Sequence, residues 1–150
     1  MNVTRSIASL LLLALTFVSP LNAREGRLLN SGISGIWAFT TKERKNGVPL
    51  GFLSLRLNVI NLKVTGTYCY VWNFGKKIDC PDDGEENIQG VLADDLGSAS
   101  IRVHSLYADQ DFKASLRLLG NTLEFNTTST PNDDRFFSAG DALLIRRIAP

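Results

Sequence analysis

Alternation of apolar and polar residues with period two dominates the chain after its first 34 residues. In the clearest run, Leu53, Leu55, Leu57 and Val59 alternate with polar side chains. This is the pattern of a strand with one buried and one solvated face. No long stretch of helical period follows, so the pattern predicts an all-β protein.

Segments rich in Gly, Pro, Asn and Asp divide this region into short strands. A polar turn with Asn46-Gly47 is expected at 42–49. The short links between strands predict an up-and-down meander that can close on itself, which removes exposed edges. The expected fold is a single antiparallel up-and-down β-barrel of about eight strands with one disulfide. The predicted strands are 35–41, 53–59, 63–72, 76–80, 87–93, 98–104, 111–119, 123–128 and 142–148.

The first 23 residues follow a different pattern. One basic residue, Arg5, precedes an apolar run at 7–18, and Pro20 and Ala23 come before the charged Arg24. This order is typical of a secretory signal peptide, and the run is well short of the roughly 20 residues that span a bilayer. We therefore expect a signal peptide at 1–23, an N-terminal extension at 24–34, a barrel domain at 35–150, and a secreted or periplasmic location without a membrane anchor.

Charge is nearly balanced, with 16 Lys and Arg residues against 15 Asp and Glu residues. Binding to nucleic acid or to an anionic membrane surface needs clustered positive charge. We accordingly expect no nucleic-acid partner and no peripheral membrane binding.

Two cysteines, Cys69 and Cys80, predict a disulfide, because an even cysteine count in an exported chain is typical of one. A hairpin that turns on Phe74-Gly75 places them directly opposite each other, at a separation that suits the bond. Together with His104 they are too few ligands for zinc, and no metal site is predicted.

The two faces of this hairpin differ in composition. The apolar set, expected inside, is Cys69, Val71, Ile78 and Cys80. The other set, expected outside, is Tyr68, Tyr70, Trp72, Lys77 and Asp79. Aromatics beside charges are typical of protein interfaces, so Tyr68, Tyr70 and Trp72 are candidate binding residues. The alternatives are that a loop covers them or that the faces are inverted.

Two loops supply further candidate binding residues. The acidic turn Asp82, Asp83, Glu85 and Glu86 could dock on a cationic enzyme or be simply solvated. Calcium is a weaker alternative, because Pro81 and Gly90 fall at positions where a calcium loop needs ligands. Arg135, Phe136 and Phe137 lie in the longest loop, where the two rings either plug a barrel end or contact a partner.

Catalytic constellations are absent from the sequence. His104 is the only histidine and has no nucleophile motif near it. Asp109 and Asp111 share a face and leave a carboxylate pair as an alternative, although a bulged turn at 107–111 explains them better. We predict no enzymatic activity, no catalytic residue and no cofactor.

Ser34-Gly35-Ile36-Trp37 resembles the Gly-x-Trp start of calycin-type barrels, which include lipocalins, avidins and small periplasmic inhibitors of bacterial metalloproteases. The resemblance implies that Trp37 packs near a closed barrel end under an arginine of the last strand, Arg146 or Arg147. The chain departs from those inhibitors in the placement of its disulfide. They have a cysteine soon after the Trp, whereas Cys69 and Cys80 both lie in a later hairpin. The segment from Tyr68 to Asp82 also resembles part of small uncharacterised exported bacterial proteins.

These observations predict an exported, non-enzymatic binding protein that recognises or inhibits another protein, such as a cationic hydrolase. By analogy with the inhibitors, residues 24–33 would project ahead of the barrel. The alternative is a lipocalin- or avidin-like carrier of a small hydrophobic ligand in the barrel. The aliphatic inward residues, among them Leu53 and Leu116, weigh against an open interior.

Overall fold

The computed structural model describes residues 32–134 and 136–148. Every regular element within these ranges is a strand, and none is a helix, which confirms the all-β prediction. The predicted signal peptide, most of the N-terminal extension and the candidate Arg135 lie outside the described residues.

Strand positions follow the predictions closely, with ends that differ by one or two residues. One difference is larger, because the expected polar turn at 42–49 contains a hairpin of two very short strands with Asn46 and Gly47 at its tip. The strands are β1 (Gly35–Thr40), β2 (Arg44–Lys45), β3 (Val48–Pro49), β4 (Gly51–Ile60), β5 (Lys63–Trp72), β6 (Lys77–Asp79), β7 (Ile88–Leu92), β8 (Ser98–Ser105), β9 (Gln110–Leu119), β10 (Thr122–Ser129) and β11 (Asp141–Arg147).

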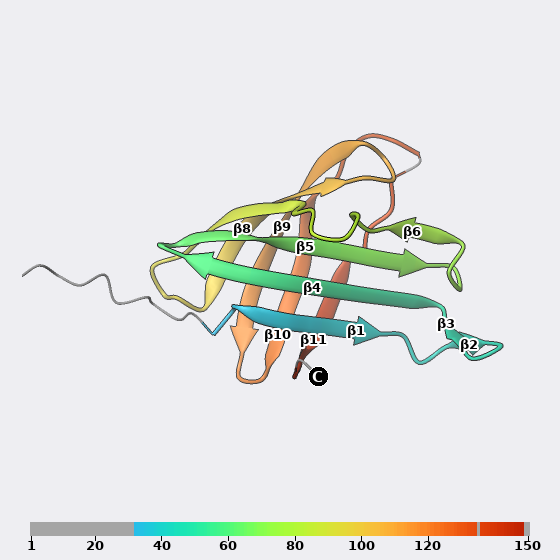
Figure 1. Cartoon of the computed structure of the whole chain (residues 1–150), viewed down its shortest axis with the longest axis horizontal. Helices are drawn as coiled ribbons and strands as arrows, with labels where there is room; N and C mark the ends of the chain where they lie inside the picture. Colours follow the sequence, from blue (N-terminus) through green and yellow to red (C-terminus); the bar gives the residue numbers. More distant parts are fainter. Residues whose placement is uncertain (1–31, 135, 149–150) are drawn as a thin grey trace, which may run out of the picture.

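Eight strand positions close into an antiparallel barrel, as predicted. Each long strand pairs with the next along the chain, and β1 pairs with β11 to complete the ring. In Figure 1, β1, β4 and β5 form the near wall, and β9, β10 and β11 pass behind them at a steep angle. Strands β6 and β7 share one position in the ring, because β5 pairs with β7 through 63–66 and with β6 through 70–72.

Gly66 marks the point where β5 changes partner. Its φ is +151°, and a Cβ atom there would collide with the carbonyl oxygen of Arg56. A glycine permits this close approach of two strands and the bend that barrel closure needs.

Asn87 bridges the gap that the interruption between β6 and β7 leaves. Its side-chain oxygen accepts the N–H of Tyr68 at 2.7 Å, and its amide nitrogen donates to the carbonyls of Tyr68 at 3.0 Å and His104 at 3.2 Å. The buried amide thus replaces the backbone ladder that β5 and β8 lack there. The predicted Cys69–Cys80 disulfide is confirmed. It joins β5 to the chain directly after β6, where the segment between β6 and β7 begins.

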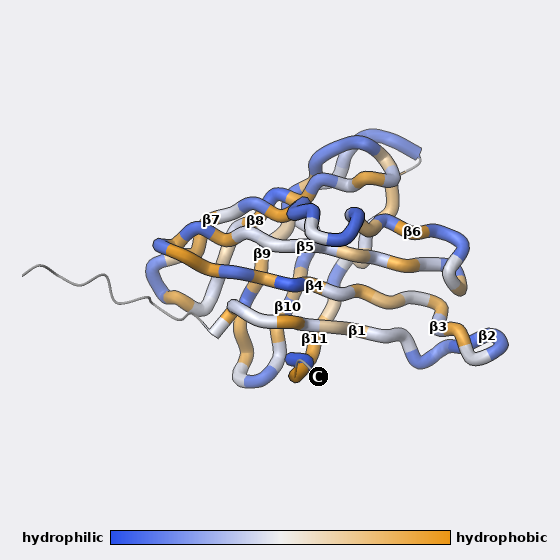
Figure 2. Tube along the Cα trace, in the orientation of Figure 1, coloured by the Kyte–Doolittle hydropathy of each residue, from blue (hydrophilic) through white to orange (hydrophobic). Residues whose placement is uncertain are grey.

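Large side chains from opposite walls meet inside the barrel. The ring of Tyr68 lies 5.4 Å from that of Phe112 and 6.0 Å from that of Phe125, centroid to centroid. Trp37, Leu55 and these three rings are all buried to 99% or more. Along β4 the hydrophobic residues alternate with hydrophilic ones, as Figure 2 shows. Rings in contact across the barrel fill this part of the interior.

The predicted faces of the cystine hairpin were wrong, although its register was right. Tyr70 pairs with Asp79 and Trp72 with Lys77, as expected from a turn at Phe74-Gly75. Tyr68, Tyr70 and Asp79 nevertheless point inward and are at least 95% buried, whereas Ile78 is 57% exposed. The interior is wide enough to need large rings, and Asp79 tolerates burial because two backbone N–H groups hold it.

One end of the barrel, called here the Trp37 end, is covered by residues 32–34. The indole N–H of Trp37 donates to the carbonyl of Ile33 at 2.8 Å. Arg146 lies 4.4 Å from the Trp37 ring centroid and donates to the carbonyls of Ser34 and Gly32. The resemblance to calycin-type barrels implied such a contact. Ile33 is fully buried, so it does not project ahead of the barrel as expected.

Candidate functional site: a cationic groove on the outer wall

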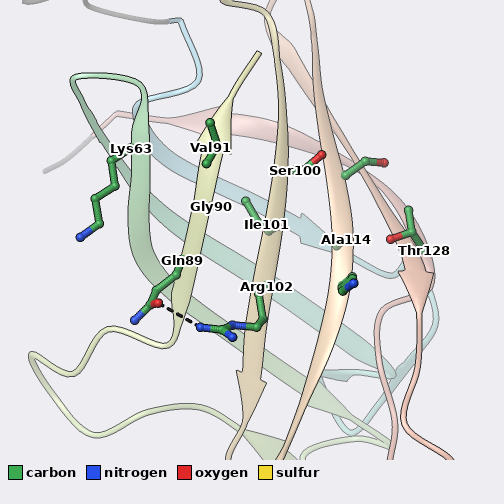
Figure 3. Close-up of a pocket in the computed structure, with 11 residues that line it drawn as sticks. Lys63, Gln89, Gly90, Val91, Ser100, Ile101, Arg102, Ala114 and Thr128 are labelled. Atoms are coloured by element: carbon green, nitrogen blue, oxygen red, sulfur yellow. Dashed lines mark hydrogen bonds between the residues drawn. The ribbon is translucent and has the colours of Figure 1, made fainter.

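A groove of about 650 Å³ crosses strands β7, β8 and β9 on the outside of the barrel (Figure 3). Two rows of outward side chains form its sides. One row joins Lys63, Val91, Ser100 and Ser115 across four strands, and the other joins Gln89, Arg102 and Lys113. In Figure 3, Val91 and Ser100 lie above Gln89 and Arg102.

Between these rows runs a floor without outward side chains. It consists of Gly90, Ile101 and Ala114, which are paired across three neighbouring strands. Ile101 and Ala114 point into the barrel and are at least 97% buried, so the groove sees mainly their backbone. Gly90 has no side chain, and a Cβ atom there would clash with the carbonyl oxygen of Ser100. The tight approach of β7 to β8 therefore requires glycine. The floor is bare because this row of residues faces the interior of the barrel.

A β-bulge closes one end of the groove. Thr127 pairs with Ala114 and Ser129 with Lys113, so the intervening Thr128 has no partner on β9. The extra residue of a bulge changes the direction of its strand and of its side chain. Thr128 is exposed and lines the groove. It adds a hydroxyl to a wall that already carries two serines.

The charges along the groove are positive. Lys63 and Lys113 are exposed, and neither makes an ion pair within residues 32–134 and 136–148. Arg102 is partly neutralised by Asp111, whose carboxylate lies 3.4 Å from its Nε. Its Nη2 also donates a hydrogen bond to Gln89 at 3.2 Å. Unpaired cations beside exposed apolar surface, here Val91 at 63% exposure, favour anionic ligands that also carry apolar groups.

His104 lies beside the groove and is held between two carboxylates. Its Nδ1 is 2.9 Å from Asp111 and its Nε2 is 3.5 Å from Asp109. The contact with Asp111 is within hydrogen-bond distance, whereas Asp109 is 92% exposed and its contact with Nε2 is longer. Asp111 contacts both His104 and Arg102. His104 therefore helps to position Arg102 at the groove through this shared carboxylate.

The structure places the candidate residues from the sequence in three different environments. Asp82, Asp83, Glu85 and Glu86 are exposed, and Glu86 accepts a hydrogen bond from Thr65 at 2.9 Å. Tyr68 and Tyr70 are inside the barrel, which corrects their expected exposure, and Trp72 packs partly buried against the core.

Phe136 and Phe137 plug the barrel end opposite to Trp37, here called the Phe137 end. Their rings lie 5.2 Å from Phe112 and 5.6 Å from Tyr70, respectively, centroid to centroid. Both pack against the core. This packing favours the plug over the partner contact among the two alternatives for the loop.

Burial perturbs the two inward phenols. It raises the pKa of Tyr70 to about 12. The pKa of Tyr68 is raised well above its usual value, mainly by burial and further by the nearby carboxylate of Asp79. Both side chains are therefore neutral hydrogen-bonding groups at physiological pH.

Sequence reasoning missed the groove. Its local signal was weak. Gln89 precedes Gly90 on β7, Lys113 and Ser115 flank Ala114 on β9, and β8 lies between these two strands. Only the pairing register shows that these short motifs align, and the sequence does not fix that register.

Within the described ranges, no helix is long and apolar enough to cross a membrane. In the same ranges, His, Cys, Asp and Glu side chains form no group of three that could hold a metal ion. Comparison with models of protein families, with curated proteins and with solved structures finds no match for this chain.

Proposed function

We propose that this protein is an exported, non-enzymatic binding protein that recognises an acidic, extended segment of another protein through the groove on β7, β8 and β9. The observation that carries the proposal is the pair of unpaired lysines, Lys63 and Lys113, on either side of a bare backbone floor. Opposite charges across an interface give specificity and fast association.

The spacing of the two lysines specifies the segment further. Lys63 lies on β5 and Lys113 on β9, with β7 and β8 between them and the two residues in different rows. At about 4.8 Å per strand, their Cα atoms are roughly 15 Å apart. An extended chain covers this distance in about four to five residues, and carboxylates an even number of positions apart lie on its same side. Two acidic residues four positions apart fit best.

The floor and walls add contacts that an acidic polypeptide can use. Val91 offers exposed apolar surface, and Ser100, Ser115 and Thr128 offer hydroxyls that donate or accept hydrogen bonds. A purely ionic ligand would leave the apolar surface uncovered. A segment that alternates acidic and small apolar residues would cover both kinds of surface.

The carrier alternative has less support. A ligand inside the barrel would have to displace rings that touch across it, such as Tyr68 with Phe112 and Phe125. Export stays part of the proposal: the Cys69–Cys80 bond is of the kind that forms in oxidising compartments. The likeness to calycin-type barrels likewise remains a proposal.

A direct test uses residues 24–150 and a short synthetic peptide with two Glu residues four positions apart among Val, Ser and Thr. We expect saturable binding that weakens as salt rises. The double variant Lys63→Glu, Lys113→Glu should lower the affinity at least about tenfold.

The matched control is Lys42→Glu, Lys45→Glu, which changes the net charge equally at exposed lysines of the β2–β3 hairpin region. This control should retain most of the parent affinity. The parent protein should in turn bind the peptide only when the two Glu residues of the peptide are intact. Equal losses in both double variants would show that only net charge matters, and the groove proposal would then fail.

A further inference from the structure

The outer wall that includes β1 and β4 carries a surface unlike the groove. In Figure 1, β1, β4 and β5 lie side by side on the near side of the barrel, and β6 follows β5. The strand register aligns outward side chains here in two rows without a charged member. One row is Ile145, Ala38, Ser54 and Cys69, and the other is Thr40, Phe52, Val71 and Ile78. These two rows are called here the uncharged face.

The apolar members of this face contact solvent rather than the core. Ile145 on β11 is 63% exposed, and Ile78 on β6 is 57% exposed. Phe52 and Val71 lie between them, are half-buried, and do not belong to the core cluster. The four gaps between five strands, at about 4.8 Å each, make the face roughly 19 Å wide. Exposed apolar surface of this extent often marks a binding surface.

Charges of both signs stand at the margins of the uncharged face. The next row of the register is Arg147, Ile36, Arg56 and Thr67. On the side of β6, Asp82 and Asp83 follow the disulfide, and with Arg56 they line a hollow of about 370 Å³. These four charged side chains are exposed, and none of them forms an ion pair within residues 32–134 and 136–148.

We propose that the uncharged face binds the same face of a second copy of this chain and forms a symmetric dimer. A two-fold axis that runs along β5 exchanges the β4 side of the face with the β6 side. Arg56 of one copy then meets Asp82 and Asp83 of the other copy, and the same contact forms twice. The two rows make the apolar centre of the interface, and the charged residues make its rim.

Charge complementarity selects a second copy as the partner. The face presents two arginines on one side and two aspartates on the other, so its best complement is the same face turned around. A partner with a single sign of charge would leave one of these sets opposite like charges. The chain carries 16 basic and 15 acidic residues, so two copies repel each other little at long range.

The size of the face indicates a dimer of moderate affinity. A stable interface buries about 800 Å² on each partner, and the uncharged face supplies only the centre of such an area. We therefore expect a dissociation constant on the order of micromolar. Sedimentation of residues 24–150 between about 1 and 100 µM should show a shift from monomer to dimer. High salt should weaken this dimer, because the rim contacts are ionic.

The first variant places charges in the centre of the interface. Ile145→Glu with Ile78→Glu should weaken the dimer at least about tenfold, and both positions are exposed enough to spare the fold. The matched control is Val91→Glu with Leu119→Glu, which makes the same change at exposed apolar residues outside the uncharged face. This control should dimerise like the parent chain.

A charge exchange tests the rim and the symmetry together. Arg56→Asp should weaken the dimer by itself, and so should Asp82→Arg with Asp83→Arg, because each places like charges opposite each other. An equimolar mixture of these two variants should dimerise again, since the exchanged charges are complementary between them.

A parent chain that stays monomeric up to about 100 µM would overturn the proposal. Equal dimerisation of the two Glu double variants, or a mixture of the charge variants that stays monomeric, would overturn it as well. The acidic-peptide test of the groove is independent of these outcomes, because Lys63 and Lys113 lie outside the uncharged face.

Discussion

The inner and outer faces of β7, β8 and β9 make opposite use of the same strands. Inside, Ile88, Val103 and Phe112 are at least 99% buried among side chains from the other walls. Outside, the same strands present Gly90 between two rows of polar and cationic side chains. The inner face is filled and the outer face is open.

This difference separates stability from recognition. Close packing inside makes each ring contribute strongly to the free energy of unfolding. Exposed charges contribute little to stability because water screens them, so they can serve a partner instead. Inner substitutions should therefore change stability and spare peptide binding, and outer substitutions should do the reverse.

The largest effect is expected from Phe112→Ala, which removes a ring that contacts Tyr68 and Phe136. The cavity and lost contacts should lower the free energy of unfolding by about 3–5 kcal/mol. Urea unfolding measures the change, with Val91→Ala on the exposed face as the control, expected within about 0.5 kcal/mol. Similar losses in both variants would contradict the contrast between the faces.

A smaller loss is expected when Cys69 and Cys80 are both replaced by Ser. The bond closes a loop with a sequence separation of 11, and removing it should cost roughly 2–3 kcal/mol. The bond shares only β5 with the groove, where Cys69 lies six positions from Lys63, so the folded double variant should bind the acidic peptide with the parent affinity. A large loss of peptide affinity would show that the two regions are coupled.

Alkaline pH provides a still milder perturbation of the interior. The pKa of Tyr70 is about 12 when folded against 10.0 when exposed. The unfolded chain therefore loses this proton first, and stability that is complete below about pH 10 falls as the pH rises toward 12. Urea unfolding at several alkaline pH values should show the fall, and Tyr70→Phe should reduce it. An unchanged slope in that variant would assign the fall to other groups.

The smallest change in stability is expected for Lys63→Glu with Lys113→Glu, within about 0.5 kcal/mol, because both side chains are exposed. Thermal unfolding in parallel with the peptide titration measures both quantities on one sample. A drop in stability as large as that of Phe112→Ala would mean that the groove charges support the fold.

Much of the fold could be predicted from local patterns. The alternation in Leu53–Val59 and the turn at Phe74-Gly75 are local signals, and both gave correct elements. The prediction of which hairpin face points inward was wrong. Tyr70 and Ile78 are both acceptable inside a barrel, and the choice between them depends on the width of the barrel. That width is set by contacts between distant strands.

The candidate sites depend even more on long-range pairing. Lys63 and Lys113 are 50 positions apart in the sequence, and only the register of four strands places them on one groove. From the sequence, Asp79 is expected to be a solvated acid near the acidic turn. Its burial could not be predicted, because the N–H groups that hold it belong to the distant residues Leu106 and Tyr107. Exposure of the acidic turn itself, at Asp82 and Glu85, follows from composition alone.

The most direct test of groove recognition is to follow the backbone amide resonances of residues 24–150 by NMR while the acidic peptide is added. We expect the shifts to concentrate in the floor and walls of the groove, at 89–91, 100–102 and 113–115, with Lys63 and Thr128 at its ends. Shifts confined to the Phe137 end or to the acidic turn at 82–86, with the groove unperturbed, would contradict the account.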